Sequence, residues 1–300
     1  IRDTSVTGVQ TCALPIQEFI REKEKEALDN DKEESAVVLL LEHVLKLETQ
    51  ALYMKMNDEI KESDLIEYNL LWNQYLHDNK PIQYLIGTSC FYGYDFIVTP
   101  DVLIPRYETE ELVENILYRY DEHFNGKDVD VCDLATGSGC IGITLAKEEK
   151  HMHVVATDIS KEALAIAKKN NEKFNAGVTF LTGDMLEPLK GRKFDIFVSN
   201  PPYIPEGEDV MSLVKDNEPN LALFGGNDGM KFYRIILKGL KPYLKKKAMI
   251  AFEHGFDKKE EMIKLANECF PNSKVEVLKD LEGRDRMTFI YVGDFKWQEE

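Results

Sequence analysis

The sequence predicts an α/β chain in which a doubly wound sheet domain follows a small helical bundle. Residues 17–80 contain no glycine and repeat apolar side chains at helical spacing, which favours helices. From about Leu112 onward, short apolar runs alternate with amphipathic segments, as in parallel strands joined by helices. Two of these runs end in a glycine-rich turn and in Asn-Pro-Pro-Tyr. In open parallel sheets, ligands bind at the edge where the strands end.

Composition limits the possible functions. The chain has 300 residues with 43% hydrophobic content, enough for one large domain or two unequal ones with a sizeable core. A net charge of −17 argues against a protein that coats nucleic acid, because phosphate binding needs clustered Lys and Arg. The five cysteines are odd in number and show no Cys-x-x-Cys spacing, so we expect neither a disulfide framework nor a zinc site. A reducing cytoplasm is expected, and no segment is apolar over the roughly 18 residues of a membrane span.

Residues 1–16 differ in character from the rest. They show no helical or strand period and resemble a translated sequencing-adapter fragment, so we interpret them as a non-native leader. A secretory signal is the alternative, but one Arg and a short, broken apolar stretch match it weakly.

The remaining chain divides into three predicted parts. Residues 17–87 form an N-terminal helical domain, 88–111 a hairpin and linker, and 112–300 the sheet domain. Thr109 is expected to cap the helix that follows the linker, because a hydroxyl there accepts from a backbone N–H. Arg106 and Glu108 belong to the linker or, equally, face the mouth of an active site.

The sheet domain is expected to contain seven strands with helices between them. Asp257 and Glu260 have the spacing of a capping box before the last helix. The expected strands cover residues 129–134, 153–157, 178–181, 194–198, 248–252, 275–278 and 287–292, and the expected helices cover residues 140–147, 164–174, 230–243 and 258–269.

A glycine-rich turn follows the first of these strands. Gly137, Gly139 and Gly142 satisfy G-x-G-x-x-G, which lets a backbone approach a nucleotide at a helix N-terminus. Asp158 ends the next strand about 20 residues later, where a carboxylate accepts from ribose hydroxyls. The alternative is that Asp158 only caps the following helix. Asp184 and Met185 follow the third strand. The Asp184 carboxylate is suited to accept from the amino group of a purine, and the Met185 side chain is suited to pack on the purine ring.

Asn-Pro-Pro-Tyr ends the strand at residues 194–198. The Asn200 side chain offers a carbonyl acceptor, and the carbonyl of Pro201 is held in a nearly fixed direction by the ring. Two acceptors can therefore converge on one NH2 group, with the flat ring of Tyr203 against it. An amide nitrogen is a poor nucleophile, so orientation must lower the barrier, by up to about 7 to 11 kcal/mol in the best cases. The alternative is a proline-terminated strand followed by an ordinary surface turn.

The chain resembles the HemK/PrmC-type methyltransferases, which modify the glutamine of the Gly-Gly-Gln motif in peptide chain release factors. Asn-Pro-Pro-Tyr by itself also occurs in adenine-N6 DNA methyltransferases, whereas its combination with Leu-Ile-Pro-Arg and with Glu-Pro to Gly-Gly-x-Asp-Gly is more selective. The stretches that carry the resemblance are residues 81–87, 103–110, 133–142, 156–160, 199–204 and 218–229.

The resemblance implies a Rossmann-like class I S-adenosylmethionine-dependent methyltransferase domain at residues 112–300. It implies that Asn200 and Pro201 hold the substrate glutamine, with Pro202 and Tyr203 beside it, and that release factors are the partners, without direct contact to nucleic acid or membrane. The implied binding residues for S-adenosylmethionine are Ala135, Thr136, Gly137, Ser138, Gly139, Asp158, Asp184, Met185 and Asn200.

Two residues depart from the family pattern. Ala135 stands where the family usually has the first glycine of its loop, and Tyr107 stands where a second proline usually follows Arg106. We expect alanine to be tolerated, with at most a modest loss of cofactor affinity, if its φ is negative.

Three alternative functions remain at this point. A DNA adenine methyltransferase would share Asn-Pro-Pro-Tyr, but the acidic charge disfavours it and no basic target-reading insert is evident. A dinucleotide oxidoreductase would use the same glycines and leave Asn-Pro-Pro-Tyr without a role. A non-catalytic binding module would transfer no methyl group.

Overall fold

A computed structural model describes residues 14–296, and most of the predicted leader, residues 1–13, lies outside them. The chain divides into two compact units, one up to Ile86 and one from Gly87 onward. Within residues 14–296, no helix is both long and apolar enough to cross a bilayer.

The N-terminal unit is helical. Helix α1 already begins at Ile16, the last residue of the predicted leader, and the Ile16 side chain is buried. Trp72 and Tyr68 stack in the core, and the indole N–H of Trp72 donates to Glu26 over 3.0 Å. The helices are α1 (Ile16–Asp29), α2 (Ser35–Leu45), α3 (Thr49–Met54), α4 (Glu62–His77) and α5 (Ile82–Ile86).

The second unit begins with a two-stranded hairpin, β1 (Thr88–Phe91) and β2 (Tyr94–Ile97). Its turn places Tyr92 and Gly93 at φ values of 52° and 77°. Helix α6 (Tyr107–Phe124) follows, and it begins two residues before Thr109. The expected Thr109 cap is therefore wrong, because Thr109 lies inside the helix with its side chain buried.

A seven-stranded sheet forms the centre of the second unit, in the order β5-β4-β3-β6-β7-β9-β8. The first five strands of this order are parallel, and β9 is antiparallel to both of its neighbours. The strands are β3 (Val129–Leu134), β4 (Met152–Asp158), β5 (Thr179–Thr182), β6 (Phe194–Ser199), β7 (Leu244–Glu253), β8 (Lys274–Lys279) and β9 (Asp285–Val292).

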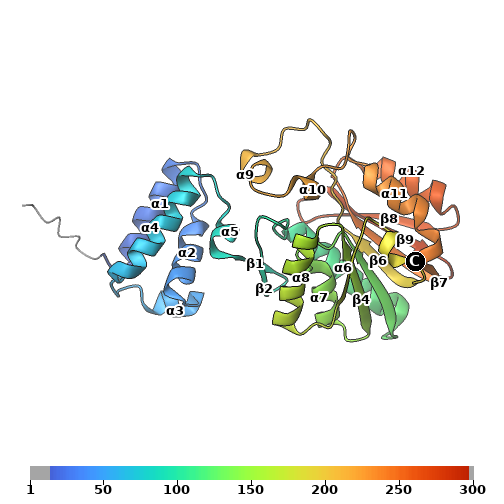
Figure 1. Ribbon diagram of the computed structural model, residues 1–300, viewed down its shortest axis with the longest axis horizontal. Coiled ribbons are helices and arrows are strands. Elements are labelled where there is room, and N and C mark those ends of the chain that lie inside the picture. The colour runs from blue at the N-terminus through green and yellow to red at the C-terminus, as the bar shows by residue number, and fades with distance from the viewer. Residues whose placement is uncertain (1–13, 297–300) are drawn as a thin grey trace, which may run out of the picture. The chain divides into compact units, whose positions relative to one another are not determined.

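Helices cover both faces of this sheet, as the doubly wound prediction requires (Figure 1). In β3, Val131 faces a core shared with α6 and α7, whereas the next residue, Cys132, faces a core shared with α11 and α12. This alternation buries the central strands β3, β6 and β7 on both sides, which is why they read as continuous apolar runs, whereas the edge strands β5 and β8 stay partly exposed. The helices are α7 (Cys140–Glu148), α8 (Lys161–Phe174), α9 (Ser212–Lys215), α10 (Asn220–Leu223), α11 (Lys231–Gly239) and α12 (Lys259–Cys269), with short 3-10 turns at Glu187–Leu189 and Lys241–Tyr243.

The predicted capping box before α12 does not form. The cap residue is Lys258, and no side chain accepts a hydrogen bond there. Asp257 instead forms an ion pair with Lys258.

Candidate active site

The turns after β3 and β6 lie side by side. The two strands are parallel neighbours, with Leu134 opposite Ser199, and the Ser199 hydroxyl donates to the Leu134 carbonyl over 2.7 Å. After β3 the chain continues to β4 and β5 on one side, and it then returns to add β6 on the other. The strand order reverses at this point, and such a reversal opens a crevice at the carboxyl ends of the strands.

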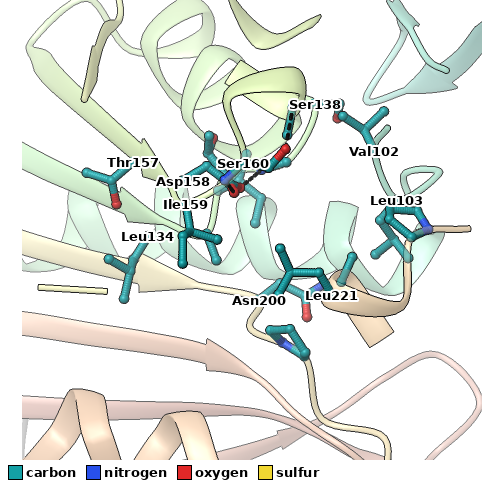
Figure 2. Close-up of a pocket in the computed structure, with 18 of the residues that line it drawn as sticks. Val102, Leu103, Leu134, Ser138, Thr157, Asp158, Ile159, Ser160, Asn200 and Leu221 are labelled. Carbon is teal, nitrogen blue, oxygen red and sulfur yellow. Dashed lines mark hydrogen bonds between the residues drawn. The ribbon is translucent and has the colours of Figure 1, made fainter. Parts of the chain in front are cut away.

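A cavity occupies this crevice, and it collects most of the predicted site residues. Figure 2 shows Asp158 and Ser138 facing Asn200 and Leu221 across it. The predicted residues that line the cavity are Ala135, Thr136, Gly137, Ser138, Asp158, Asp184, Met185, Asn200 and Pro202.

Three predicted residues do not line this cavity. Gly139 is the N-cap of α7 at φ 84°, a conformation that favours glycine, and a Cβ built on it would lie 2.7 Å from the end of the Ile143 side chain. Pro201 is buried. Tyr203 lines a second cavity, to which Asn200 and Arg106 also belong. Asn200 therefore borders both cavities.

Asp158 holds the glycine turn as well as the start of α8. Its Oδ2 accepts from the Gly137 N–H and its Oδ1 from the Ser160 N–H, each over 2.9 Å. The cap of α8 itself is Ser160, whose hydroxyl accepts from Ala163. Asp158 is thus more than a helix cap, since it also fixes the turn that borders the cavity. Burial raises the pKa of this carboxyl.

Ala135 adopts a left-handed conformation with φ 59°. The expectation that alanine is tolerated here required a negative φ, so its premise is wrong. A Cβ at positive φ costs roughly 1–2 kcal/mol, which glycine does not pay. The next residue, Thr136, is held by two hydrogen bonds. Its backbone N–H donates to the Thr157 carbonyl and its hydroxyl donates to Asp133.

Asp133 lies fully buried beneath the same turn. Its Oδ2 accepts from the Thr136 hydroxyl and from the Gly142 N–H. Its Oδ1 has no hydrogen-bond partner within residues 14–296. Burial raises the pKa of this carboxyl to about 6, because the charged form loses its hydration.

The tetrapeptide rests on a second glycine-rich segment. A Cβ on Gly225 would lie 2.5 Å from the Pro202 carbonyl oxygen, and one on Gly229 would lie 2.2 Å from that of Tyr203. The Gly225 N–H donates to the Ile204 carbonyl over 2.8 Å. The Gly-Gly-x-Asp-Gly stretch therefore supports the backbone of Asn-Pro-Pro-Tyr directly.

Arg106 forms an ion pair with the buried Glu218 at the rim of the cavity. The other oxygen of Glu218 accepts from the Ile104 N–H over 3.1 Å. This pair ties two motifs together, Leu-Ile-Pro-Arg and Glu-Pro, which lie more than a hundred residues apart in the chain. Arg106 thus lies at the mouth of the cavity, the alternative that the sequence left open.

The cavity suits a nucleoside that carries a positive charge. Its acidic lining residues include Asp101, Asp158 and Asp184, whereas Arg106, the one basic residue among the described lining residues, is neutralised by Glu218. The hydroxyl of Thr157 is buried and lacks a partner within the described chain. A Cβ on Gly137 would meet no atom within 4 Å, so the turn is open to a ligand. Apolar side chains that a base could contact are Leu134, Ile159, Met185, Leu221 and Phe232.

Sequence reasoning missed two polar side chains behind Asn200. Thr109, interpreted as a cap, donates to the buried Glu253 over 2.7 Å, and Asn200 donates to Thr109 over 3.2 Å. Glu253 is the last residue of β7, at the same sheet edge as Asn200. The rule that side chains at strand ends form sites would have selected Glu253.

The strand order, the glycine turn after β3 and the polar end of β6 define a class I methyltransferase. A family model described as "Methyltransferase small domain" matches residues 112–218, and "PrmC N-terminal domain" matches residues 21–87. A solved methyltransferase from Pyrococcus furiosus shares the fold, with a TM-score of 0.50 and 17% identity over 78% of this chain and 100% of that one.

Curated relatives narrow the class to one family. A release factor glutamine methyltransferase from Bacillus cereus is 44% identical over 268 residues, which cover 87% of this chain and 93% of the relative. One from Bacillus subtilis is 43% identical over 262 residues, which cover 85% and 90%. The chain belongs to the release factor glutamine methyltransferase family, whose members are S-adenosylmethionine-dependent protein-glutamine methyltransferases.

Proposed function

We propose that this protein transfers a methyl group from S-adenosylmethionine to the side-chain amide nitrogen of the glutamine in the Gly-Gly-Gln motif of peptide chain release factors. The observation that supports this most directly is the position of Asn200. It borders the acidic cavity beside the glycine turn and also the second cavity beside Tyr203. A donor on one side and an acceptor amide on the other would meet at this residue.

The chain's own residues suggest how the cofactor is held. The turn at residues 135–138 would receive its amino-acid part, Asp158 would accept from the ribose hydroxyls, and Asp184 with Met185 would flank the base. When bound, S-adenosylmethionine supplies a methyl group activated by a sulfonium, which an uncharged nitrogen can accept with loss of a proton.

The residues on the substrate side of Asn200 would orient the glutamine amide. The Asn200 side-chain carbonyl and the Pro201 carbonyl would accept the two amide N–H bonds of glutamine, and Tyr203 would lie against the amide plane. Holding a weak nucleophile in place lowers its barrier through entropy, so no strong base is needed. Burial of Pro201 and Pro202 fixes the backbone from which these groups project.

The acidic charge supports a protein substrate over DNA. A net charge of −17 opposes the phosphate contacts that a DNA adenine methyltransferase requires. A dinucleotide oxidoreductase would leave Asn200 and the two prolines without a chemical role.

Mass spectrometry of a release factor incubated with the protein and S-adenosylmethionine tests the proposal. We expect one added methyl on the Gly-Gly-Gln glutamine and none on a DNA duplex supplied in parallel. Asn200→Ala should lower kcat by at least about 100-fold while cofactor affinity changes little, because the lost acceptor orients the substrate. Unmodified glutamine with the wild-type protein, or full activity of the variant, would overturn the proposal.

A further inference from the structure

A chain of hydrogen bonds runs from Asn200 into the protein interior. Asn200 Nδ2 lies 3.2 Å from Thr109 Oγ1, and Thr109 Oγ1 lies 2.7 Å from Glu253 Oε2. Thr109 and Glu253 are 3% and 1% exposed, so these bonds are shielded from bulk water, although Thr109 borders the first cavity and Glu253 the second. The three residues come from the end of β6, the first turns of α6 and the end of β7.

The order of donors along this chain follows from chemistry. A carboxylate oxygen only accepts, so the single hydroxyl proton of Thr109 is directed at Glu253. The lone pairs of Thr109 are then left for Asn200, which must present its NH2 group to them. Since the amide oxygen lies on the opposite side of the same planar group, Asn200 Oδ1 points away from Thr109 and remains free to accept.

Glu253 also contacts Tyr203, a second residue of the Asn-Pro-Pro-Tyr segment. Its Oε1 accepts from the Tyr203 hydroxyl over 3.3 Å. Its backbone carbonyl accepts from Tyr233 over 2.7 Å, which anchors the end of β7. One buried carboxyl group therefore contacts Tyr203 directly and Asn200 through Thr109. Burial raises the pKa of the Glu253 carboxyl, while the hydrogen bond from Thr109 and the charge of nearby Arg286, which is itself bound to Asp280, oppose that rise.

We propose that Thr109 and Glu253 are positioning residues that fix the orientation of the Asn200 amide, so that its carbonyl oxygen faces the acceptor nitrogen. This inference rests on the proposed function, because it assigns the direction in which Asn200 meets the substrate. An asparagine can rotate by half a turn with almost no change of shape. A rotated Asn200 would direct its NH2 group at the NH2 group of glutamine, and two donors repel instead of bonding.

Substitution of Thr109 tests the hydroxyl without changing the volume greatly. Thr109→Val removes both hydrogen bonds, and we expect kcat for the release factor to fall about 10- to 100-fold, the usual effect of losing orientation at a reacting group. The Kd for S-adenosylmethionine, measured by titration calorimetry, should stay within about twofold, because Thr109, although it lines the first cavity, directs its hydroxyl to Glu253 and Asn200, and valine keeps its shape. Thr109→Ser keeps the hydroxyl and should restore kcat to within about threefold of wild type.

Thr144→Val is the matched control. Thr144 is fully buried in α7, and its hydroxyl has no partner within residues 14–296. The same change of side chain there should leave kcat unaltered. If Thr109→Val keeps wild-type kcat, or if Thr109→Ser is as impaired as Thr109→Val, the positioning role is refuted.

A double-mutant cycle tests whether Glu253 acts through Thr109. Glu253→Gln should lower kcat by a smaller factor in the Thr109→Val background than in the wild-type background, because the shared path is already broken. Equal factors in both backgrounds would refute this coupling.

A measurement without substrate separates this inference from the proposed function. The side-chain NH2 signals of Asn200 in a 15N-labelled sample are identified by their loss in Asn200→Ala. Thr109→Val should shift these signals and speed their exchange with water, whereas Thr144→Val should not. Unchanged signals would overturn the hydrogen-bond chain even if the release factor is methylated, and shifted signals would support it even if it is not.

Discussion

Ala135→Gly should stabilise the protein, although glycine usually destabilises a fold. Ala135 is held at φ 59° in the turn that borders the cavity, a conformation that alanine adopts only with strain. The strain costs roughly 1–2 kcal/mol, and glycine removes it. Glycine also makes the unfolded chain more flexible, which costs roughly 0.4–1 kcal/mol. The difference leaves a net gain of about 0.5–1 kcal/mol in the free energy of unfolding.

The measurement is calorimetric unfolding, and the Tm is taken from the transition in which the second unit unfolds. At about 2–4 °C per kcal/mol for a domain of this size, the gain corresponds to a rise in Tm of about 1–4 °C. Ala176→Gly is the matched control. Ala176 is absent from the positive-φ residues of the described chain and packs against the core, so the same substitution should lower Tm. A fall in Tm for Ala135→Gly as large as that for Ala176→Gly would refute the strain argument.

Two further predictions concern the supports of the site. Gly229→Ala should lower kcat about 10-fold or more, because its Cβ would lie 2.2 Å from the Tyr203 carbonyl oxygen and displace the tetrapeptide. Gly207→Ala carries a similar positive-φ strain but meets no atom within 4 Å, so its kcat should stay near wild type, and equal losses in the two variants would contradict the steric argument. Asp133→Asn should gain stability relative to wild type as the pH rises from 4 to 7. The folded-state pKa of about 6 lies above the ordinary value of 3.8 for an aspartate, so the folded wild type binds the extra proton and loses stability as that proton leaves. The difference in unfolding free energy should reach about 3 kcal/mol by urea titration, and parallel pH profiles would show that Asp133 does not titrate in this way.

The sequence was sufficient to predict the elements that carry the site. Apolar runs of strand length, separated by helical periods, predicted all seven strands of the main sheet to within a few residues. The turn after Leu134 and the tetrapeptide after Ser199 follow such runs, so their position at strand ends could be predicted from local pattern alone. The strands and the turns at their ends depend on local sequence, because the spacing of apolar residues and the fixed geometry of proline act over only a few residues.

The tertiary structure decided which of these ends meet, and in what orientation. The pairing of β3 with β6 joins segments 65 residues apart, and the intervening chain does not specify it. The Thr109 hydroxyl became a link to Glu253 because α6 begins earlier than its local cap signal indicates. Ala135 keeps a left-handed φ against the preference of alanine itself, and the next residue, Thr136, is bound across to Thr157 of β4 and back to Asp133 of β3. Long-range hydrogen bonds and burial outweigh local preference at these positions, so the orientation of the site is a property of the folded chain.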